Sequence, residues 1–194
     1  PASTMPASYC SSMLYSKRAR RFSAMLDMLR GPGQPPRAFT IHHCMKHVRK
    51  SVLLWYSPQE MYDLVTGIDA YPEFLPWCDK AELLQQHADG VTARLGLAYM
   101  GVRHAFTTRN HHVPGSSVKM HLVDGPFSRL DGTWHFRELG RAGTPKQACK
   151  VEFDLRYAFS SKALETVVSP VFDRVANTFV ESFVRRAEDT YGAR

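Results

Sequence analysis

The chain has 194 residues, of which 44% are hydrophobic and 22% charged, a composition typical of globular proteins. No stretch approaches the roughly 18 consecutive apolar residues of a membrane-spanning helix, so we do not expect an integral membrane protein. The formal net charge of +7 suggests a nucleic acid or an anionic membrane as partner. However, six basic residues and one acidic residue lie in residues 1–44, so the remaining 150 residues carry a net charge of only +2.

Residues 1–44 form a basic leader that we do not expect to belong to the fold. The Gly31–Pro36 segment, rich in glycine and proline, would interrupt any helix or strand. Before it, Phe22, Met25, Leu26 and Leu29 have the spacing of a short amphipathic helix. An Arg- and Ser-rich, acid-poor segment is typical of an organelle transit peptide. We favour the alternative of a disordered extension, or of upstream sequence translated from an over-long start.

The patterned region begins at Met45, and we assign residues 45–194 to one folded domain. Alternating apolar residues over 46–56 predict a strand. Ser57-Pro58-Gln59-Glu60 then predicts a helix start, with Ser57 as N-cap and Glu60 at the third helical position. This helix should end at Gly67. A second short helix or turn is expected over 69–75, ended by Pro76.

The rest of the domain alternates with a period of two and then changes to a helical period. Strands are predicted over 91–99, 104–112, 118–122, 134–136 and 151–159, with turn residues between them, including a loop from Gly140 to Pro145. Residues 161–190 predict a helix on the order of 45 Å long, with a kink or broken turn near Pro170. The expected fold is α+β: a curved antiparallel sheet of about seven strands around the long C-terminal helix.

Motifs that carry catalytic or metal chemistry are weak in this sequence. Cys10, Cys44, Cys78 and Cys149 are far apart and have no zinc-type spacing, so we expect reduced thiols. His43 and His47 have the spacing of helical metal ligands, but His47 falls in a predicted strand, so we expect surface histidines and no metal site. No serine-nucleophile, dinucleotide-binding or P-loop motif is present. We therefore do not expect an enzyme.

Several basic residues of the domain are candidates for binding a nucleic acid. The candidates are Lys46, Arg49, Lys50, Arg103, Arg109, Arg185 and Arg186. A basic patch on one face could bind phosphate despite the low net charge. Since no RNA-binding aromatic motif or helix-turn-helix is evident, we favour solvated charges on several faces and expect no DNA partner.

Large aromatic side chains are more numerous than a compact core of this size needs. They fall at Tyr71, Phe74, Trp77, Phe106, Phe127, Trp134, Phe136, Phe153, Phe172, Phe179 and Phe183. For any single ring, filling the core is the simpler explanation. Together they favour an apolar tunnel between sheet and helix that suits a hydrophobic ligand.

Several ordered motifs resemble the coenzyme Q-binding START-like family of the polyketide cyclase/START superfamily. They are Tyr56-Ser57-Pro58-Gln59-Glu60-Met61-Tyr62-Asp63-Leu64-Val65, Tyr71-Pro72-Glu73-Phe74-Leu75-Pro76-Trp77-Cys78, Phe106-Thr107-Thr108-Arg109-Asn110, Leu122-Val123-Asp124-Gly125-Pro126-Phe127, Leu130-Asp131-Gly132-Thr133-Trp134-His135-Phe136 and Val151-Glu152-Phe153. The likeness covers essentially all of 45–194 and none of 1–44. It implies the helix-grip fold that the periodicity already suggests.

The resemblance implies two functions. Mitochondrial members of the family bind ubiquinone and support respiration as lipid carriers or chaperones, whereas bacterial ribosome association toxins bind the large ribosomal subunit and block subunit association. We rank the non-enzymatic ubiquinone carrier first and the ribosome-directed toxin second. A cyclase-type enzyme is a third hypothesis, which needs an acid or base inside the cavity.

Under the carrier hypothesis, ubiquinone is the bound ligand and aromatic residues line its cavity. The candidate binding residues are Tyr71, Phe74, Leu75, Trp77, Phe106, Met120, Phe127, Trp134, Phe136, Phe153, Val175 and Phe179. Tyr71, Trp77 or Trp134 could donate a hydrogen bond to the quinone ring. The expected location is the cytoplasm, with a possible peripheral contact at the inner membrane, or the mitochondrial matrix if the leader is a transit peptide.

Overall fold

The computed structural model describes residues 45–99, 101–140 and 148–194. The predictions for the leader over 1–44 lie outside these residues. Cys10, Cys44 and His43 also lie outside them, and so does most of the loop predicted between Gly140 and Pro145.

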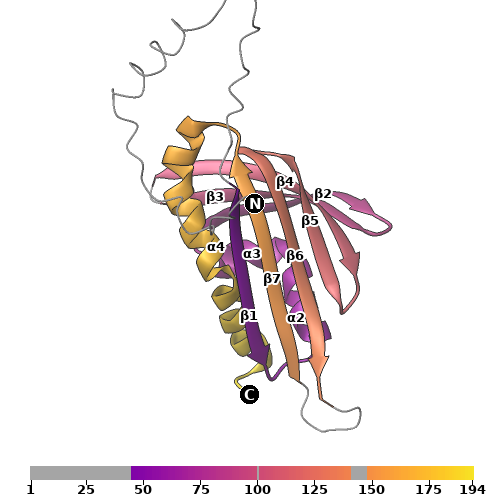
Figure 1. Ribbon diagram of the computed structural model, residues 1–194. Coiled ribbons are helices and arrows are strands. Elements are labelled where there is room, and N and C mark those ends of the chain that lie inside the picture. The colour runs from indigo at the N-terminus through magenta and orange to yellow at the C-terminus, as the bar shows by residue number, and fades with distance from the viewer. Residues whose placement is uncertain (1–44, 100, 141–147) are drawn as a thin grey trace, which may run out of the picture. The chain divides into compact units, whose positions relative to one another are not determined.

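Seven antiparallel strands form one curved sheet in the order β1-β7-β6-β5-β4-β3-β2 (Figure 1). The strands are β1 (Lys46–Leu54), β2 (Cys78–His87), β3 (Gly90–Tyr99), β4 (Val102–Val113), β5 (Ser117–Asp124), β6 (Phe127–Leu139) and β7 (Ala148–Phe159). In β7, Val151, Phe153 and Leu155 are buried, whereas the residues between them are half-buried. This period-two pattern gives the sheet an apolar inner face and a polar outer face.

Short helices follow β1 as the sequence predicts. Helix α2 (Pro58–Thr66) begins at Ser57, whose Oγ accepts a hydrogen bond from the Glu60 backbone N–H at 3.1 Å. The Glu60 carboxylate in turn accepts from the Ser57 N–H at 2.7 Å, which completes the capping box. The helix ends at Gly67. The second short element consists of the 3₁₀ turn η1 (Ile68–Ala70) and helix α3 (Tyr71–Phe74).

The long C-terminal helix α4 (Lys162–Tyr191) lies across the inner face of the sheet (Figure 1). Its buried stripe includes Val168, Val175, Phe179 and Phe183, which confirms the predicted helical period. The helix continues through Pro170, so the predicted broken turn does not occur. Pro170 is exposed and removes only one backbone donor, while its buried neighbours hold the helix against the sheet.

A polar cluster fastens the first half of α4 to the edge of the sheet. The Lys46 ammonium on β1 lies 2.5 Å from the Asp173 carboxylate on α4 and also donates to Ser169. The Tyr157 hydroxyl on β7 donates to the other oxygen of Asp173. Burial, and then the hydrogen bond to Asp173, raise the pKa of Tyr157 above its usual range. We call these four residues the α4 clamp.

Two strands differ from the pattern expected of the sequence. No alternation singled out residues 78–87, yet they form β2, a strand at the edge of the sheet with most of its residues exposed. Strand β6 extends well beyond the predicted 134–136, because it pairs with β7 along Phe127–Leu139. Among the described residues, no helix is long and apolar enough to cross a membrane.

Candidate functional site

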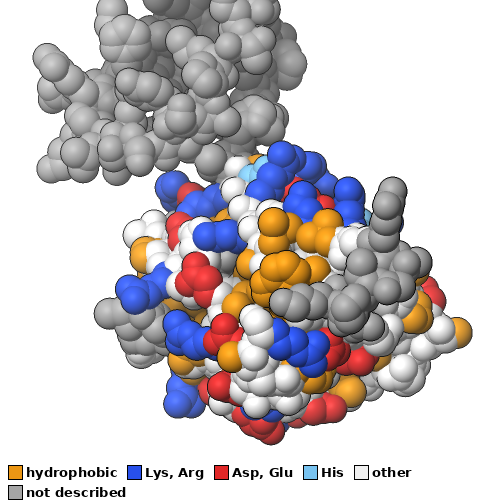
Figure 2. All heavy atoms as spheres, turned by 90° about the horizontal axis from the view of Figure 1, so that it is seen from below, with side chains coloured by type: hydrophobic (Ala, Val, Ile, Leu, Met, Phe, Trp, Pro, Cys, Tyr) orange, Lys and Arg blue, Asp and Glu red, His pale blue; other side chains and the backbone are white. Residues whose placement is uncertain are grey.

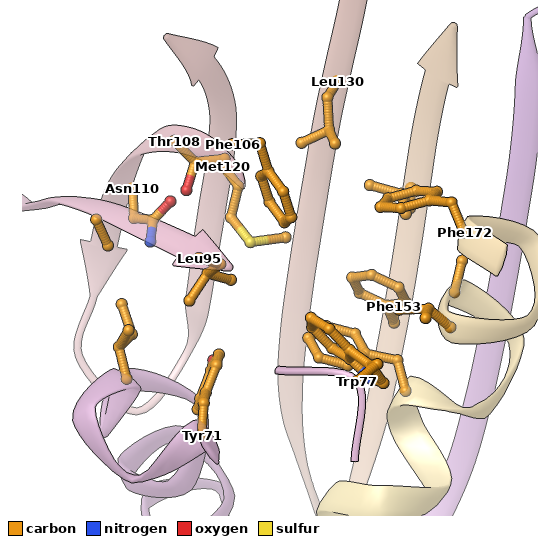
Figure 3. A pocket seen from close by; sticks show the side chains of 16 residues that line it. Tyr71, Trp77, Leu95, Phe106, Thr108, Asn110, Met120, Leu130, Phe153 and Phe172 are labelled. Carbon is orange, nitrogen blue, oxygen red and sulfur yellow. The ribbon is translucent and has the colours of Figure 1, made fainter. Parts of the chain in front are cut away.

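A small apolar cavity lies between the inner face of the sheet and helix α4. It has a volume of about 50 Å³. The residues that line it are Ile68, Tyr71, Trp77, Ala93, Leu95, Phe106, Thr108, Asn110, Met120, Leu130, Phe153, Leu155, Phe172, Val175, Ala176 and Phe179. Figure 3 shows Thr108 and Asn110 at the β4 side of the cavity and the rings of Phe153, Phe172 and Trp77 at the α4 side. The cavity therefore has one polar side and one aromatic side.

The structure brings seven of the predicted binding residues to the cavity surface. They are Tyr71, Trp77, Phe106, Met120, Phe153, Val175 and Phe179. The other five, Phe74, Leu75, Phe127, Trp134 and Phe136, lie behind the lining. Trp134, for example, packs its ring 4.4 Å from that of Phe153, and Phe127 packs 4.8 Å from Phe172. Trp134, Phe127 and Phe74 thus pack against lining residues, and a ligand-binding role for all twelve stays a prediction.

Nine lining residues were not among the predicted binding residues. They are Ile68, Ala93, Leu95, Thr108, Asn110, Leu130, Leu155, Phe172 and Ala176. The sequence held a signal for two of them, because Thr108 and Asn110 follow Phe106 at intervals of two and so share its face of β4. Both side chains are polar, yet each is at least 95% buried.

The expected tunnel is closed by the aromatic rings themselves. The ring of Phe179 on α4 packs against several rings of the domain interior, with its centroid 5.4 Å from Phe153 and 5.6 Å from both Trp77 and Trp134. Two turns before Phe179 on α4, the ring of Phe172 lies 4.8 Å from that of Tyr157 on β7. Because these rings interdigitate, the space between sheet and helix is filled except for the small cavity.

Two polar atoms of the lining are buried and make no hydrogen bond with the described residues: the Asn110 Oδ1 and the Trp77 Nε1. Trp134 Nε1 is also unpartnered, but it does not face the cavity. The Tyr71 hydroxyl donates to the Val65 carbonyl at 2.6 Å and is not free for a ligand. A donor role for Trp77 stays a prediction, and the Asn110 Oδ1 is an unpartnered acceptor in the same lining.

Ionisable chemistry is scarce around the cavity. Tyr71 is the one titratable side chain among its lining residues, and burial raises the pKa of its hydroxyl. Cys78 and Cys149 are buried free thiols, and burial raises the pKa of each to about 11. Within the described ranges, no three His, Cys, Asp or Glu side chains are grouped to hold a metal ion. The arrangement suits a neutral, largely apolar ligand.

Known proteins match almost the whole folded domain. Residues 54–184 match the family described as polyketide cyclase / dehydrase and lipid transport. The ribosome association toxin RatA of Vibrio cholerae is 40% identical over 148 residues, which cover 76% of this chain and 99% of that protein. RatA of Pseudomonas aeruginosa is 38% identical over 146 residues, covering 75% and 98%. The mitochondrial coenzyme Q-binding protein COQ10 homolog B of Xenopus laevis is 28% identical over 144 residues, covering 74% and 58%.

Solved structures share the fold at lower identity. A START superfamily protein from Mycobacterium smegmatis has a TM-score of 0.61 and 18% identity, covering 74% of this chain and 97% of its own. The Zhui aromatase/cyclase from Streptomyces sp. R1128 has a TM-score of 0.61 and 16% identity, covering 75% and 94%. These likenesses confirm the predicted helix-grip arrangement. With a family match over most of the domain and relatives of up to 40% identity, the chain belongs to the START-like polyketide cyclase / dehydrase and lipid transport family.

Proposed function

We propose that this chain associates with the ribosome, binding the large subunit and opposing its association with the small one. The observation that carries the proposal is the similarity to proteins named ribosome association toxin, which spans about three quarters of this chain and nearly the full length of those relatives. The coenzyme Q-binding relative is more distant. The order of the two functions is thus the reverse of the one that the sequence analysis favoured. A ribosome-bound role would place the protein in the cytoplasm.

The cavity volume supports this order. Pockets for small molecules usually measure about 300–1,000 Å³, whereas this cavity measures about 50 Å³. The elements around this cavity would have to move apart before an isoprenoid quinone could enter it. A protein that acts through its surface needs no such movement.

We also propose that the domain is not an enzyme. General acid–base catalysis needs a titratable group within reach of a substrate. Tyr71 is the one such group among the cavity-lining residues, and its proton is committed to the Val65 carbonyl. This supports a binding role and leaves the cyclase-type hypothesis without a candidate acid or base in the cavity.

Sedimentation tests the ribosome proposal directly. The full chain is mixed with purified ribosomal subunits at physiological salt and magnesium, and the gradient is analysed for protein and for joined ribosomes. We expect the protein in the large-subunit fraction and fewer joined ribosomes as its concentration rises. A protein that stays at the top of the gradient, with joining unchanged, would refute the proposal.

A second candidate function, ubiquinone carriage, is favoured by the composition of the cavity. Its aromatic side would accept an isoprenoid tail, and the unpartnered Trp77 donor would meet a quinone oxygen. Organic extraction of the full chain, purified from quinone-replete cells, should then release ubiquinone. An extract without quinone would count against carriage, whatever the sedimentation result. A peripheral contact with the inner membrane belongs to this candidate and stays a prediction.

A further inference from the structure

Basic side chains concentrate on the outer face of the sheet, the face turned away from α4. The Lys and Arg residues there are Arg49, Arg94, Arg109, Lys119, Arg129, Arg137, Lys150 and Arg156, and the histidines are His47, His111, His121 and His135. The carboxylates on the same strand faces are Glu82, which lies opposite Arg94 and is paired with Lys80, and Asp131, Glu152 and Asp154; Asp89 joins them from the turn between β2 and β3. The face therefore has an excess of positive charge.

Strand register makes this face continuous. Directly opposed residues of an antiparallel pair lie on the same face of the sheet. One such row begins at β1 and passes through five more strands in the order His47, Arg156, Asp131, His121, Arg109 and Thr92. At the spacing of neighbouring strands, about 4.8 Å, this row is roughly 24 Å long. A surface of that length can meet several phosphates of one nucleic acid.

Four of these carboxylates are each contacted by at least two basic groups, and Glu82 is contacted by Lys80 at 2.6 Å. Asp154 accepts from His47 at 2.8 Å and from Arg49 at 2.9 Å. Glu152 lies 2.8 Å from Lys150 and 3.3 Å from Arg137.

The remaining two carboxylates repeat this arrangement. Asp131 is paired with His121 and Arg129, and Asp89 with Arg109 and His111. The acids are thus neutralised within the face and hold the basic side chains in place, while the surplus positive charge points to solvent.

Charge on the other layer has the opposite sign. Residues 57–77, which form α2, η1 and α3, contain Glu60, Asp63, Asp69 and Glu73 and no Lys, Arg or His. Figure 2 shows Lys, Arg and His side chains crowded along one rim of the domain and Asp and Glu side chains at the opposite rim. The small net charge of the domain therefore conceals two surfaces of different sign.

We propose that the outer face of the sheet is the surface that contacts the sugar–phosphate backbone of ribosomal RNA. The inference rests on the proposed ribosome association and adds which face binds and that RNA is what it binds. Arginine, lysine and histidine donors suit phosphate oxygens. Within the strands, the described residues of the face include no Phe, Tyr or Trp on which a single-stranded base could stack, although the exposed Trp55 follows the end of β1. The face therefore fits folded, helical RNA read by its backbone rather than by its sequence.

Matched charge reversals in the full chain test this proposal. The test variant is Arg94→Glu with Lys119→Glu, two exposed residues of the outer face with no ion pair among the described residues. The control is Arg174→Glu with Arg185→Glu, two exposed residues of α4 that equally lack a described ion pair. Both variants change the net charge by the same amount. Each is tested against large ribosomal subunits and against refolded, protein-free large-subunit RNA.

We expect the outer-face variant to lose about tenfold or more in affinity for both probes, and its salt dependence to fall by about one unit of slope for each lost phosphate contact. The α4 control should bind as the unaltered chain does. If both variants bind subunits as well as the unaltered chain does, the outer face is not the binding surface, although ribosome association stands.

Binding to protein-free RNA through the outer face, without binding to subunits, would retain the RNA-binding face and refute the ribosomal function. Binding to neither probe refutes both. Binding to phosphatidylglycerol vesicles but not to RNA would overturn RNA as the partner.

Discussion

Asn110 is a buried polar residue whose side chain is expected to lower the stability of the folded domain. Its Oδ1 makes no hydrogen bond with the described residues, and leaving an acceptor unsatisfied costs about 1–3 kcal/mol. Leucine has a similar size, and the adjacent cavity has room for a small adjustment. We expect Asn110→Leu to raise the free energy of unfolding by about 1 kcal/mol, measured by urea denaturation.

The neighbouring Thr108→Val variant is the matched control, since it removes a hydroxyl from the same wall of the cavity. If Asn110→Leu instead lowers the free energy of unfolding by 1 kcal/mol or more, the amide is hydrogen-bonded in solution. The idea of an amide held ready for a ligand would then be wrong.

For single residues, the sequence predicts which side chains are buried better than it predicts which of them contact the cavity. It identified the aromatic residues of the interior, because large rings at strand and helix spacing must be buried. It could not separate Trp134, which lies behind the lining, from Trp77, which lies in it. That difference depends on how the rings interdigitate across the domain, and no local pattern records it.

Helix α4 is held to the sheet by the α4 clamp as well as by its apolar stripe. Removing the Asp173 carboxylate leaves the Tyr157 hydroxyl and the Lys46 ammonium without their shared acceptor. Since Asp173 is partly exposed, solvent replaces some of the lost interaction. We expect Asp173→Ala to lower the free energy of unfolding by roughly 2 kcal/mol and Tyr157→Phe by about 1 kcal/mol.

Urea denaturation of both variants checks this expectation, with Asp189→Ala as the control. Asp189 is an exposed acid on the same helix with no ion pair among the described residues, and such surface changes usually stay within about 0.5 kcal/mol. An Asp173→Ala variant as stable as the control would mean that packing alone holds the helix.

Helices and strands were predictable where capping residues mark their start or where a regular hydrophobic period runs along them. Ser57 and Glu60 predicted the start of α2, and the stripe from Val168 to Ala187 predicted α4. Strand β2 was not evident, because an edge strand exposed on both faces shows no alternation of burial. The clamp joins residues more than 100 positions apart and also left no local signal.

For the whole molecule, the net charge alone does not show where a charged binding surface lies. A value of +2 over 45–194 suggested that charge says little about binding, and the seven basic residues weighed for a nucleic-acid patch do scatter. Lys46 faces Asp173, and Arg186 faces Glu73. The strand register places two of the seven, Arg49 and Arg109, on one face together with other basic residues. The sequence holds those residues, but their assembly is a property of the sheet.

The carboxylates that organise this face should also set the acid stability of the domain. Hydrogen bonds from His111 and Arg109 lower the pKa of Asp89 to about 2, and a hydrogen bond from Lys150 lowers that of Glu152. Partial burial opposes the shift at Asp131 and Asp154, but hydrogen bonds from basic neighbours outweigh it, so both pKa values are also lowered. The folded state therefore binds fewer protons than the unfolded state at acidic pH. Its stability must fall as pH decreases.

We expect the contribution of these carboxylates to the free energy of unfolding to stay nearly constant above about pH 5, where they are ionised in both states, and to decline from about pH 4 towards pH 2. Urea denaturation at a series of pH values measures this curve. The Asp89→Asn, Asp131→Asn double variant lacks two of the groups and should give a flatter curve between pH 5 and pH 3. An equally steep curve would mean that other carboxylates govern acid unfolding and that the outer face contributes little. A flatter curve would mean that the pairing of these carboxylates with basic side chains on the outer face stabilises the sheet.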